Sequence, residues 1–291
     1  MSPRVLLRVL RVHHWTKNLL VFVPLLMAHD VNDSRRVVNA LLIFVSFCFA
    51  SSATYIINDV VDAKHDRLHR SRRNRPISAN EISVRAALWI VPFAVAASLA
   101  IAASIKREAA FGIVLYLLLS TLYTLVVKRV MLADVILLAA FYSLRVLIGG
   151  AATGIVVSRW LLAFSSFLFI SLALAKRYSD LTRAVSNAEE APGGRSYRTG
   201  DREVLLSLGT SSGLISVLVF ALYLNSAQVT QLYTKTDPLW LICALLMYWI
   251  GRMWLLAHRG EIDDDPIVTA ATDPASYIVA AAAALIVLAS I

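Results

Sequence analysis

Charged residues are scarce in this sequence. They make up 16% of 291 residues, while hydrophobic residues make up 58%. A soluble globular protein has about 25% charged residues and about 45–50% apolar ones. The apolar excess is too large for an ordinary core, so the composition predicts a protein that resides in a lipid bilayer and has no sizeable soluble domain.

Cysteine and cleavage signals are also rare. The two cysteines, Cys48 and Cys243, both lie inside apolar segments. They therefore indicate small core residues rather than a disulfide or a metal pair. The N-terminal stretch contains Arg4, Arg8 and Arg11, but no small-residue cleavage site follows it. We interpret it as an uncleaved, cytoplasmic amphipathic segment.

Long apolar segments account for most of the chain. A transmembrane helix needs about 20 mostly apolar residues. Segments of this kind lie near 17–29, 37–57, 85–104, 109–127, 130–149, 160–176, 204–225, 238–257 and 274–291. We therefore predict an all-α polytopic membrane protein with about nine transmembrane helices, in which residues 1–291 form a single integral-membrane domain.

Basic residues are distributed unevenly between the two sides of these segments. With the N-terminus inside, 21 of the 28 Lys and Arg residues fall on the cytoplasmic side and six on the other. This bias follows the positive-inside rule, so a nucleic-acid partner is not needed to explain the net charge of +9. The long loops 58–84 and 177–203 share the basic side. They place the polar chemistry at the cytoplasmic face of the inner membrane, and Pro192–Gly194 in the second loop allows either a lid or an ordinary loop.

The motif "NDVVDAKHD", residues 58–66, follows directly on an apolar segment. If the helix continues, Asn58, Asp59, Asp62 and Asp66 lie within about a quarter turn of one another. Like-charged carboxylates on one face repel unless a cation lies between them. Mg²⁺ prefers such oxygen ligands together with substrate phosphates, and Mn²⁺ could replace it. The spacing therefore favours a metal–diphosphate site over a solvated helix end paired with nearby basic residues.

An arginine run follows the acidic motif. Its members are Arg67, Arg70, Arg72, Arg73 and Arg75. Arginine binds phosphate oxygens in a bidentate manner, so Arg67, Arg73 and Arg75 are candidates for gripping a diphosphate. Membrane topology and attraction to anionic lipids are the alternative roles. Arg75 is the preferred phosphate ligand because Pro76 follows it.

Two ionisable residues lie within one apolar segment. Asp134 and Arg145 are eleven residues apart, on one helix face but separated by about 16 Å along the axis. Ionisable groups at this depth are costly and usually face a cavity or a partner. Each therefore needs either a substrate or another helix. At the end of the next span, "AKRYSDL" supplies cations beside one carboxylate, Asp180.

The stretch "NDVVDAKHDRLHRSRRNRPI" resembles the first acidic motif, NDxxDxxxD, of the UbiA superfamily of intramembrane prenyltransferases. The order of features is similar to that family over essentially the whole chain. The resemblance implies nine helices around a central cavity open to the cytoplasmic side. It also implies Mg²⁺ that is held by acidic motifs and binds a diphosphate.

The second acidic motif departs from that of aromatic prenyltransferases. They carry a DxxxD cluster where this sequence has only Asp180. The stretches "RVHHWTKN", "YSLRVLIGGAATGIVVSRW" and "KRYSDL" resemble instead the branch that contains decaprenyl-phosphate phosphoribosyltransferase. This branch transfers ribose 5-phosphate from 5-phosphoribosyl 1-diphosphate (PRPP) to a polyprenyl phosphate and releases diphosphate. It thereby implies a role in cell-wall arabinan precursor synthesis.

The resemblance also implies roles for individual residues. Asn58, Asp59, Asp62 and Asp66 would bind the metal and the leaving diphosphate. A phosphate of the sugar or lipid would be held by the cations Lys17, Arg145, Lys176 and Arg177. Tyr178 would orient a phosphate or a sugar hydroxyl. The remaining candidates for substrate binding are Arg67, Arg73, Arg75, Asp134, Tyr142 and Asp180, and those for catalysis are Asp59, Asp62, Asp66, Arg145 and Lys176.

Two other functions stay open. An aromatic prenyltransferase would use the first acidic motif to bind a polyprenyl diphosphate donor. A transporter would line its pathway with the intramembrane charges. The transporter is disfavoured because paired Gly/Pro-broken helices are lacking and the charges gather on one side.

Overall fold

The computed structural model describes residues 2–67, 73–186, 196–262 and 265–291. All regular secondary structure in these residues is helical, without a strand, which confirms the all-α prediction. Seven of the described helices are long and apolar enough to cross a membrane, and an eighth apolar helix has 17 residues. The chain is thus a multi-pass membrane protein, whereas the count of nine spans stays a prediction.

The chain divides into two compact units. Unit 1 comprises Met1–Lys128 and Leu144–Val157, and unit 2 comprises Arg129–Ser143 and Ser158–Ile291. The helices of unit 1 are α1 (Pro3–Val9), the 3₁₀ helix η1 (Val12–Phe22), α2 (Val23–Met27), α3 (Ser34–Asp66), α4 (Val84–Ile105) and α5 (Arg107–Leu125). The short 3₁₀ helix η2 (Val127–Arg129) ends at the first residue of unit 2. Helix α6 (Ala133–Thr153) divides between the units at Leu144.

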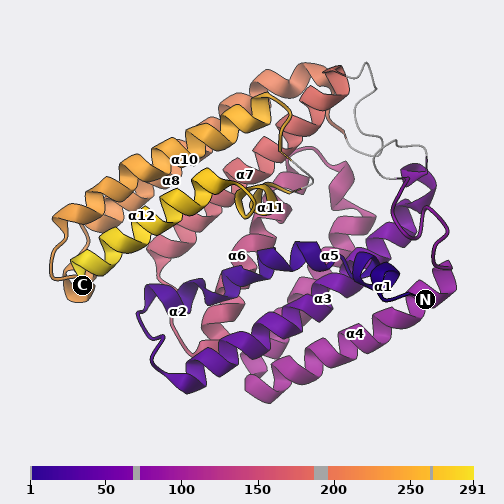
Figure 1. Ribbon diagram of the computed structural model, residues 1–291, viewed down its shortest axis with the longest axis horizontal. Helices are drawn as coiled ribbons and strands as arrows, with labels where there is room; N and C mark the ends of the chain where they lie inside the picture. The colour runs from indigo at the N-terminus through magenta and orange to yellow at the C-terminus, as the bar shows by residue number, and fades with distance from the viewer. Residues whose placement is uncertain (1, 68–72, 187–195, 263–264) are drawn as a thin grey trace. The chain divides into compact units, whose positions relative to one another are not determined.

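Helix α3 positions the acidic motif. It has 33 residues, which is more than the roughly 20 that span a bilayer. It runs beside α4 (Figure 1), and the Ser46 hydroxyl donates to the carbonyl of Ser98 at 2.9 Å. The last turns of α3 therefore extend beyond its most apolar part, so residues 58–66 of the predicted loop 58–84 are helical.

The first predicted span, residues 17–29, is not one continuous α-helix. The chain there is η1, which ends at Phe22, followed by the five-residue helix α2. Polar side chains fix η1 on α3, since Trp15 Nε1 donates to Ser52 Oγ at 3.1 Å. Helix α6 also approaches it closely, because a Cβ at Gly149 would lie 2.1 Å from the Val21 carbonyl oxygen. These contacts with α3 and α6 are not visible in a hydropathy pattern, which indicates an apolar segment and not the type of helix.

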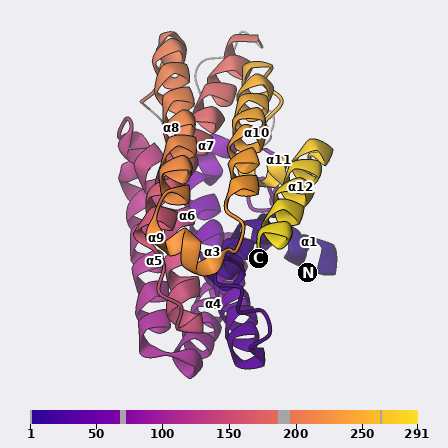
Figure 2. The ribbon, with the colours of Figure 1, turned by 90° about the vertical axis from the view of Figure 1, so that its left-hand side faces the viewer.

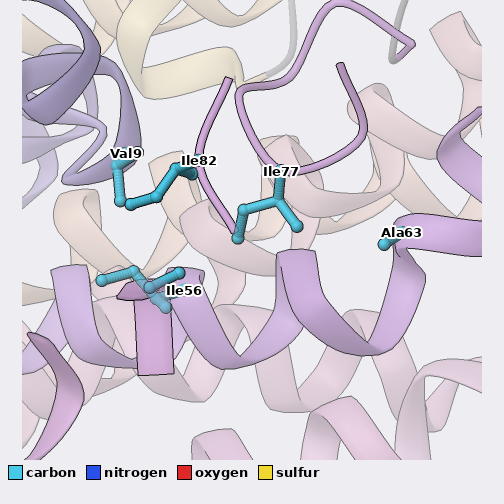
Figure 3. Packing of buried hydrophobic residues seen from close by; sticks show 6 residues of the cluster. Val9, Ile56, Ala63, Ile77 and Ile82 are labelled. Carbon is cyan, nitrogen blue, oxygen red and sulfur yellow. The ribbon is translucent and has the colours of Figure 1, made fainter. Parts of the chain in front are cut away.

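A small apolar cluster anchors the N-terminus to the end of α3. Figure 3 shows Val9 of α1 beside Ile82, and the cluster also includes Ile56, Ala63, Ile77 and Ala87. Fully burying a Val or Ile side chain contributes roughly 1.5–3 kcal/mol. Outside this cluster, Arg8 donates to Glu81 at 2.7 Å and to the carbonyl of Asn74 at 2.5 Å. The segment 73–83 is thereby fixed against the acidic motif.

Unit 2 is built around three helices that pack side by side, α7, α8 and α10 (Figure 2). Its elements are the first part of α6, then α7 (Arg159–Ser186), η3 (Thr199–Asp201), α8 (Arg202–Leu224), α9 (Ala227–Leu232), η4 (Asp237–Trp240), α10 (Leu241–His258), α11 (Pro266–Ala270) and α12 (Pro274–Ser290). A Cβ at Gly209 of α8 would lie 2.1 Å from the Trp254 ring of α10. Small residues in α8 thus permit close helix contact, as is common in membranes.

Candidate active site

The end of α3 carries three carboxylates that are all paired with cations. Asp59 and Asp66 are buried, at 3% and 2% exposure. Arg75 Nη1 contacts both, at 3.3 Å from Asp59 and 2.6 Å from Asp66. One guanidinium reaches both aspartates because they lie on the same side of the helix, as the spacing predicts.

Two further cations complete this pairing. Arg11 forms a bidentate pair with Asp59, from Nε at 3.1 Å and Nη2 at 2.5 Å. Lys128 contacts Asp62 at 2.5 Å, and the Asp62 side chain is 26% exposed. Sequence reasoning assigned neither cation to the motif, because Arg11 lies 48 residues from Asp59 and Lys128 lies 66 residues from Asp62. Only the contact between elements identifies these partners.

The acidic motif suits a hard divalent ion in its chemistry. Its donors are carboxylate and amide oxygens, the ligands that Mg²⁺ prefers, and half-buried Asn58 precedes Asp59 directly. No group of three or more His, Cys, Asp or Glu side chains within the described ranges is arranged to hold a metal. Basic side chains lie against these carboxylates instead. The assignment of Asn58, Asp59, Asp62 and Asp66 as metal ligands stays a prediction.

Of the arginine run, Arg67 and Arg75 have clear contacts. Arg67 donates from Nε to the carbonyl of Ser78 at 3.3 Å and from Nη2 to Asn80 Oδ1 at 2.9 Å. It therefore ties the end of α3 to the following turn, while Arg75 contacts the motif itself. Arg73 is exposed. Two other residues of the run, Arg70 and Arg72, lie outside the described residues.

Arg145 lies in unit 1 and is 3% exposed. Its Nε donates to Asn18 Oδ1 at 3.0 Å, and its Nη2 donates to the Tyr116 hydroxyl at 3.4 Å. The guanidinium also lies 5.4 Å from the Phe47 ring centroid and 5.1 Å from that of Tyr116. These partners come from η1, α3 and α5, so neighbouring helices surround the buried cation. Lys17 of η1 is likewise buried and donates to the Tyr55 hydroxyl at 3.2 Å.

Asp134 lies in unit 2 and is fully buried. It accepts from Arg177 Nε at 2.7 Å and from the Tyr197 hydroxyl at 2.6 Å. Burial raises the pKa of Tyr197 above its ordinary value, and the hydrogen bond to Asp134 raises it further. Tyr197 is therefore a neutral donor at physiological pH. Arg177 also reaches Asp180 at 3.5 Å, and Asp180 accepts from Arg183 at 2.8 Å.

The two tyrosines that the sequence singled out contact the end of α10 and the residue that precedes α11. The Tyr142 hydroxyl donates to Asp265 Oδ2 at 2.7 Å, and the Tyr178 hydroxyl lies 2.8 Å from His258 Nδ1. Asp265 also caps α11 by accepting from the Ile267 amide at 3.0 Å. Sequence reasoning missed Asp265 and His258. Lys176 is half-buried on α7, and the Pro192–Gly194 segment lies outside the described residues.

Comparison with known proteins identifies the family. Residues 19–270 match the UbiA prenyltransferase family. The chain belongs to this family. The resemblance of the acidic motif to the UbiA superfamily is therefore confirmed, and the protein is a membrane-embedded enzyme of that superfamily.

Relatives of this chain include an uncharacterised protein, a nodulation protein and a phosphoribosyltransferase. The uncharacterised protein y4nM of Sinorhizobium fredii is 39% identical over 94% of this chain, which spans about half of that relative (53%). Nodulation protein NoeC of Azorhizobium caulinodans is 32% identical over 92% of this chain and 87% of its own length. Decaprenyl-phosphate phosphoribosyltransferase of Mycolicibacterium smegmatis is 26% identical over 89% of this chain and 82% of its own length.

Solved UbiA structures share the fold. A UbiA homologue from Archaeoglobus fulgidus bound to GPP and Mg²⁺ aligns with a TM-score of 0.72 and 20% identity, covering 97% of this chain and 99% of its own. The same homologue bound to Cd²⁺ aligns with a TM-score of 0.67 and 21% identity, covering 97% of each chain. The similarity therefore extends over nearly the whole chain, and these homologues bind divalent metals.

Proposed function

We propose that this protein transfers 5-phosphoribose from PRPP to a polyprenyl phosphate, releasing diphosphate in a Mg²⁺-dependent reaction. The observation that carries the proposal is the difference between the acidic motif at the end of α3 and the region where a second acidic motif is expected. Unit 1 has three carboxylates at the end of α3, whereas the "KRYSDL" region has Asp180 alone, engaged by Arg177 and Arg183. A monophosphate lipid demands fewer metal-binding carboxylates than a second diphosphate would.

The end of α3 suits the diphosphate of the donor. Asn58, Asp59, Asp62 and Asp66 would hold Mg²⁺, which supplies stabilisation of the charge that develops on the leaving diphosphate. The cations that now contact these carboxylates can turn to phosphate oxygens, which arginine binds in a bidentate manner. Arg75 is the strongest candidate because it already contacts two of the aspartates.

The transfer exchanges one C–O bond for another. The bond between ribose C1 and the diphosphate oxygen breaks, and its electron pair leaves with the diphosphate. A bond forms between C1 and an oxygen of the lipid phosphate, which is already anionic at neutral pH. No proton transfer is required, so the residues needed are those that position and neutralise phosphates.

Buried or half-buried cations are the proposed phosphate ligands of each unit. In unit 1 they are Lys17 and Arg145. In unit 2 they are Lys176 and Arg177, with Tyr178 orienting a hydroxyl or phosphate and with Tyr142 and Asp134 as further candidates for substrate binding. We further propose that these groups face the cytoplasm, where PRPP is water-soluble, and that the lipid enters from the bilayer. The product would serve arabinan precursor synthesis in the cell wall.

A UbiA-type aromatic prenyltransferase is the second candidate. The family description and a homologue solved with GPP and Mg²⁺ favour it. In that case the same aspartates would hold a polyprenyl diphosphate, and an aromatic ring would attack the prenyl carbon. A single acceptor assay distinguishes the two reactions because their labelled products differ.

The test uses the purified full chain in detergent with Mg²⁺, radiolabelled PRPP and a polyprenyl phosphate. A labelled lipid is expected. Asp62→Asn should reduce its formation by more than about tenfold, because a metal ligand is lost. Asp30→Asn is the matched control, since Asp30 precedes α3 and pairs with Arg36 in its first turn, at the opposite end from Asp62. An absence of labelled lipid, together with prenylation of an aromatic acceptor from a polyprenyl diphosphate, would refute the proposal.

A further inference from the structure

Tyr55 lies on α3 one turn before Asp59, so the two side chains share a face. Three residues of the N-terminal segment meet its ring. The Arg11 guanidinium lies 5.2 Å from the ring centroid, the His14 ring centroid 5.3 Å away, and Lys17 Nζ 5.6 Å away. Lys17 also donates to the Tyr55 hydroxyl at 3.2 Å. Sequence reasoning did not single out Tyr55.

The 3₁₀ geometry of η1 explains this convergence. Side chains three residues apart lie above one another in a 3₁₀ helix, whereas in an α-helix each step of three rotates them by about 60°. His14 and Lys17 follow this spacing of three within η1, and Arg11 is the N-cap residue that precedes its first turn. An eleven-residue 3₁₀ run is unusual, since most extend over three or four residues. The backbone conformation thus lines up one edge of η1 against a single tyrosine.

The backbone of Arg11 indicates that contacts with α3 hold this edge of η1 in place. Its φ of 50° lies in the left-handed region, which is unfavourable for a residue with a side chain. Such a conformation persists where the surroundings determine it. Here the bidentate pair with Asp59 fixes the Arg11 side chain. The acidic motif and the cationic edge of η1 are therefore one connected arrangement.

An aromatic ring attracts cations to its face, and a hydroxyl directs one of them. Tyr55 therefore sets where the Lys17 ammonium lies relative to Arg11 and Asp59. A buried ammonium near a second cation suits a compact, multiply charged anion, and a phosphate monoester has that chemistry. Such an anion would bind one helical turn from the carboxylates that the proposed function assigns to the diphosphate.

We propose that Tyr55 is a positioning residue that orients Lys17 to bind a phosphate-monoester group of a substrate. This rests on the proposed function, which supplies two such groups: the 5-phosphate of PRPP and the head group of the polyprenyl phosphate. The ring holds the cationic edge of η1, and the hydroxyl directs Lys17. Loss of the hydroxyl alone should therefore act through Lys17 and through no other residue.

The test is a double-mutant cycle on the full chain in detergent, read out by calorimetric titration. Ribose 5-phosphate and geranyl phosphate are titrated separately, so that the two sources of the monoester are distinguished. Tyr55→Phe should weaken binding of one ligand by about tenfold, the effect of losing a hydrogen bond to a charged group. Tyr55→Leu should weaken it further because the ring contact is lost. In a Lys17→Ala background, Tyr55→Phe should have no additional effect.

Tyr248→Phe is the matched control, because Tyr248 is 56% exposed on α10. Thermal unfolding of each variant establishes that it is folded. Unchanged affinity in Tyr55→Phe, an equal loss in the Lys17→Ala background, or no binding of either ligand to the natural chain would overturn the inference. Tyr55–Lys17 coupling in a chain that forms no labelled lipid from PRPP and prenylates an aromatic acceptor would support this inference while refuting the proposed function.

Discussion

Three basic side chains neutralise the carboxylates at the end of α3, and they come from three different segments of the chain. Arg11 and Arg75 approach Asp59 from two different segments, and Lys128 approaches Asp62 from a third. Burying an aspartate without a partner is costly. The pairs keep the motif folded, and a metal with a diphosphate would have to replace them. A metal without the diphosphate would leave the displaced cations without an anion to bind.

Asp273 provides a residue-scale prediction about pH. It accepts from Arg252 at 2.7 Å and from the Ser276 amide at 3.1 Å, where it caps α12. The hydrogen bond from Arg252 lowers the pKa of Asp273 to about 2, from an ordinary value of 3.8. A carboxyl whose pKa is depressed by folding stabilises the protein above its unfolded pKa. That contribution is lost as the pH falls through the folded pKa.

We therefore expect Asp273→Asn to lower the Tm at neutral pH while keeping the cap, since Asn caps helices as well as Asp. The difference from the natural chain should shrink between about pH 4 and pH 2, where the carboxyl becomes protonated. Thermal unfolding in detergent across this range measures it. A difference in Tm that stays constant down to pH 2 would contradict the assigned ion pair.

At the scale of elements, glycines decide how closely helices pack in unit 2. A Cβ at Gly209 would lie 2.1 Å from the Trp254 ring, and Ser171 joins the two by accepting from Trp254 Nε1 and donating to the Gly209 carbonyl. Gly209→Ala should therefore destabilise the protein by about 1–3 kcal/mol, the usual cost of overpacking. Reversible unfolding in detergent measures the change.

Gly251 of α10 is the matched control for Gly209. A Cβ there meets nothing within 4 Å, so Gly251→Ala should be neutral or stabilise by roughly 0.5–1 kcal/mol through helix propensity. Equal effects of the two substitutions on stability would contradict the assignment, because the contact with Trp254 exists only at Gly209.

Hydropathy predicts the long apolar helices well, both those mostly buried in the protein, such as α3 and α6, and those mostly exposed, such as α4. The segments around α3 to α8 were predicted because apolar runs of about 20 residues have few alternatives in a bilayer. The segment 17–29 is instead divided between η1 and α2, and Trp15 and Asn18 form hydrogen bonds to α3 that hydropathy does not predict. The spacing of Asp59 and Asp66 predicted their shared face, but it carried no information about Lys128. Partners distant in sequence depend on which helices meet.

At the scale of the whole molecule, the charge bias predicts an orientation. Asn32 and Ala79 are both exposed and lie beyond opposite ends of α3 in the chain order of unit 1. Six Lys and Arg residues lie in the loop 58–84, and Arg85 directly follows it. The positive-inside rule therefore places Ala79 in the cytoplasm and Asn32 outside. An active site served by PRPP requires this orientation, because the donor is a charged, water-soluble molecule that cannot cross the bilayer unaided.

Cysteine labelling in intact cells tests the orientation. In a background of Cys48→Ala and Cys243→Ala, a membrane-impermeant maleimide should label Asn32→Cys in intact cells. It should label Ala79→Cys only after the membrane is permeabilised. Both variants must retain transfer activity in isolated membranes, which shows that labelling reports the working orientation. Labelling of Ala79→Cys from outside would place the acidic end of α3 away from cytoplasmic PRPP, and the donor would then have to be one that reaches the site through the lipid.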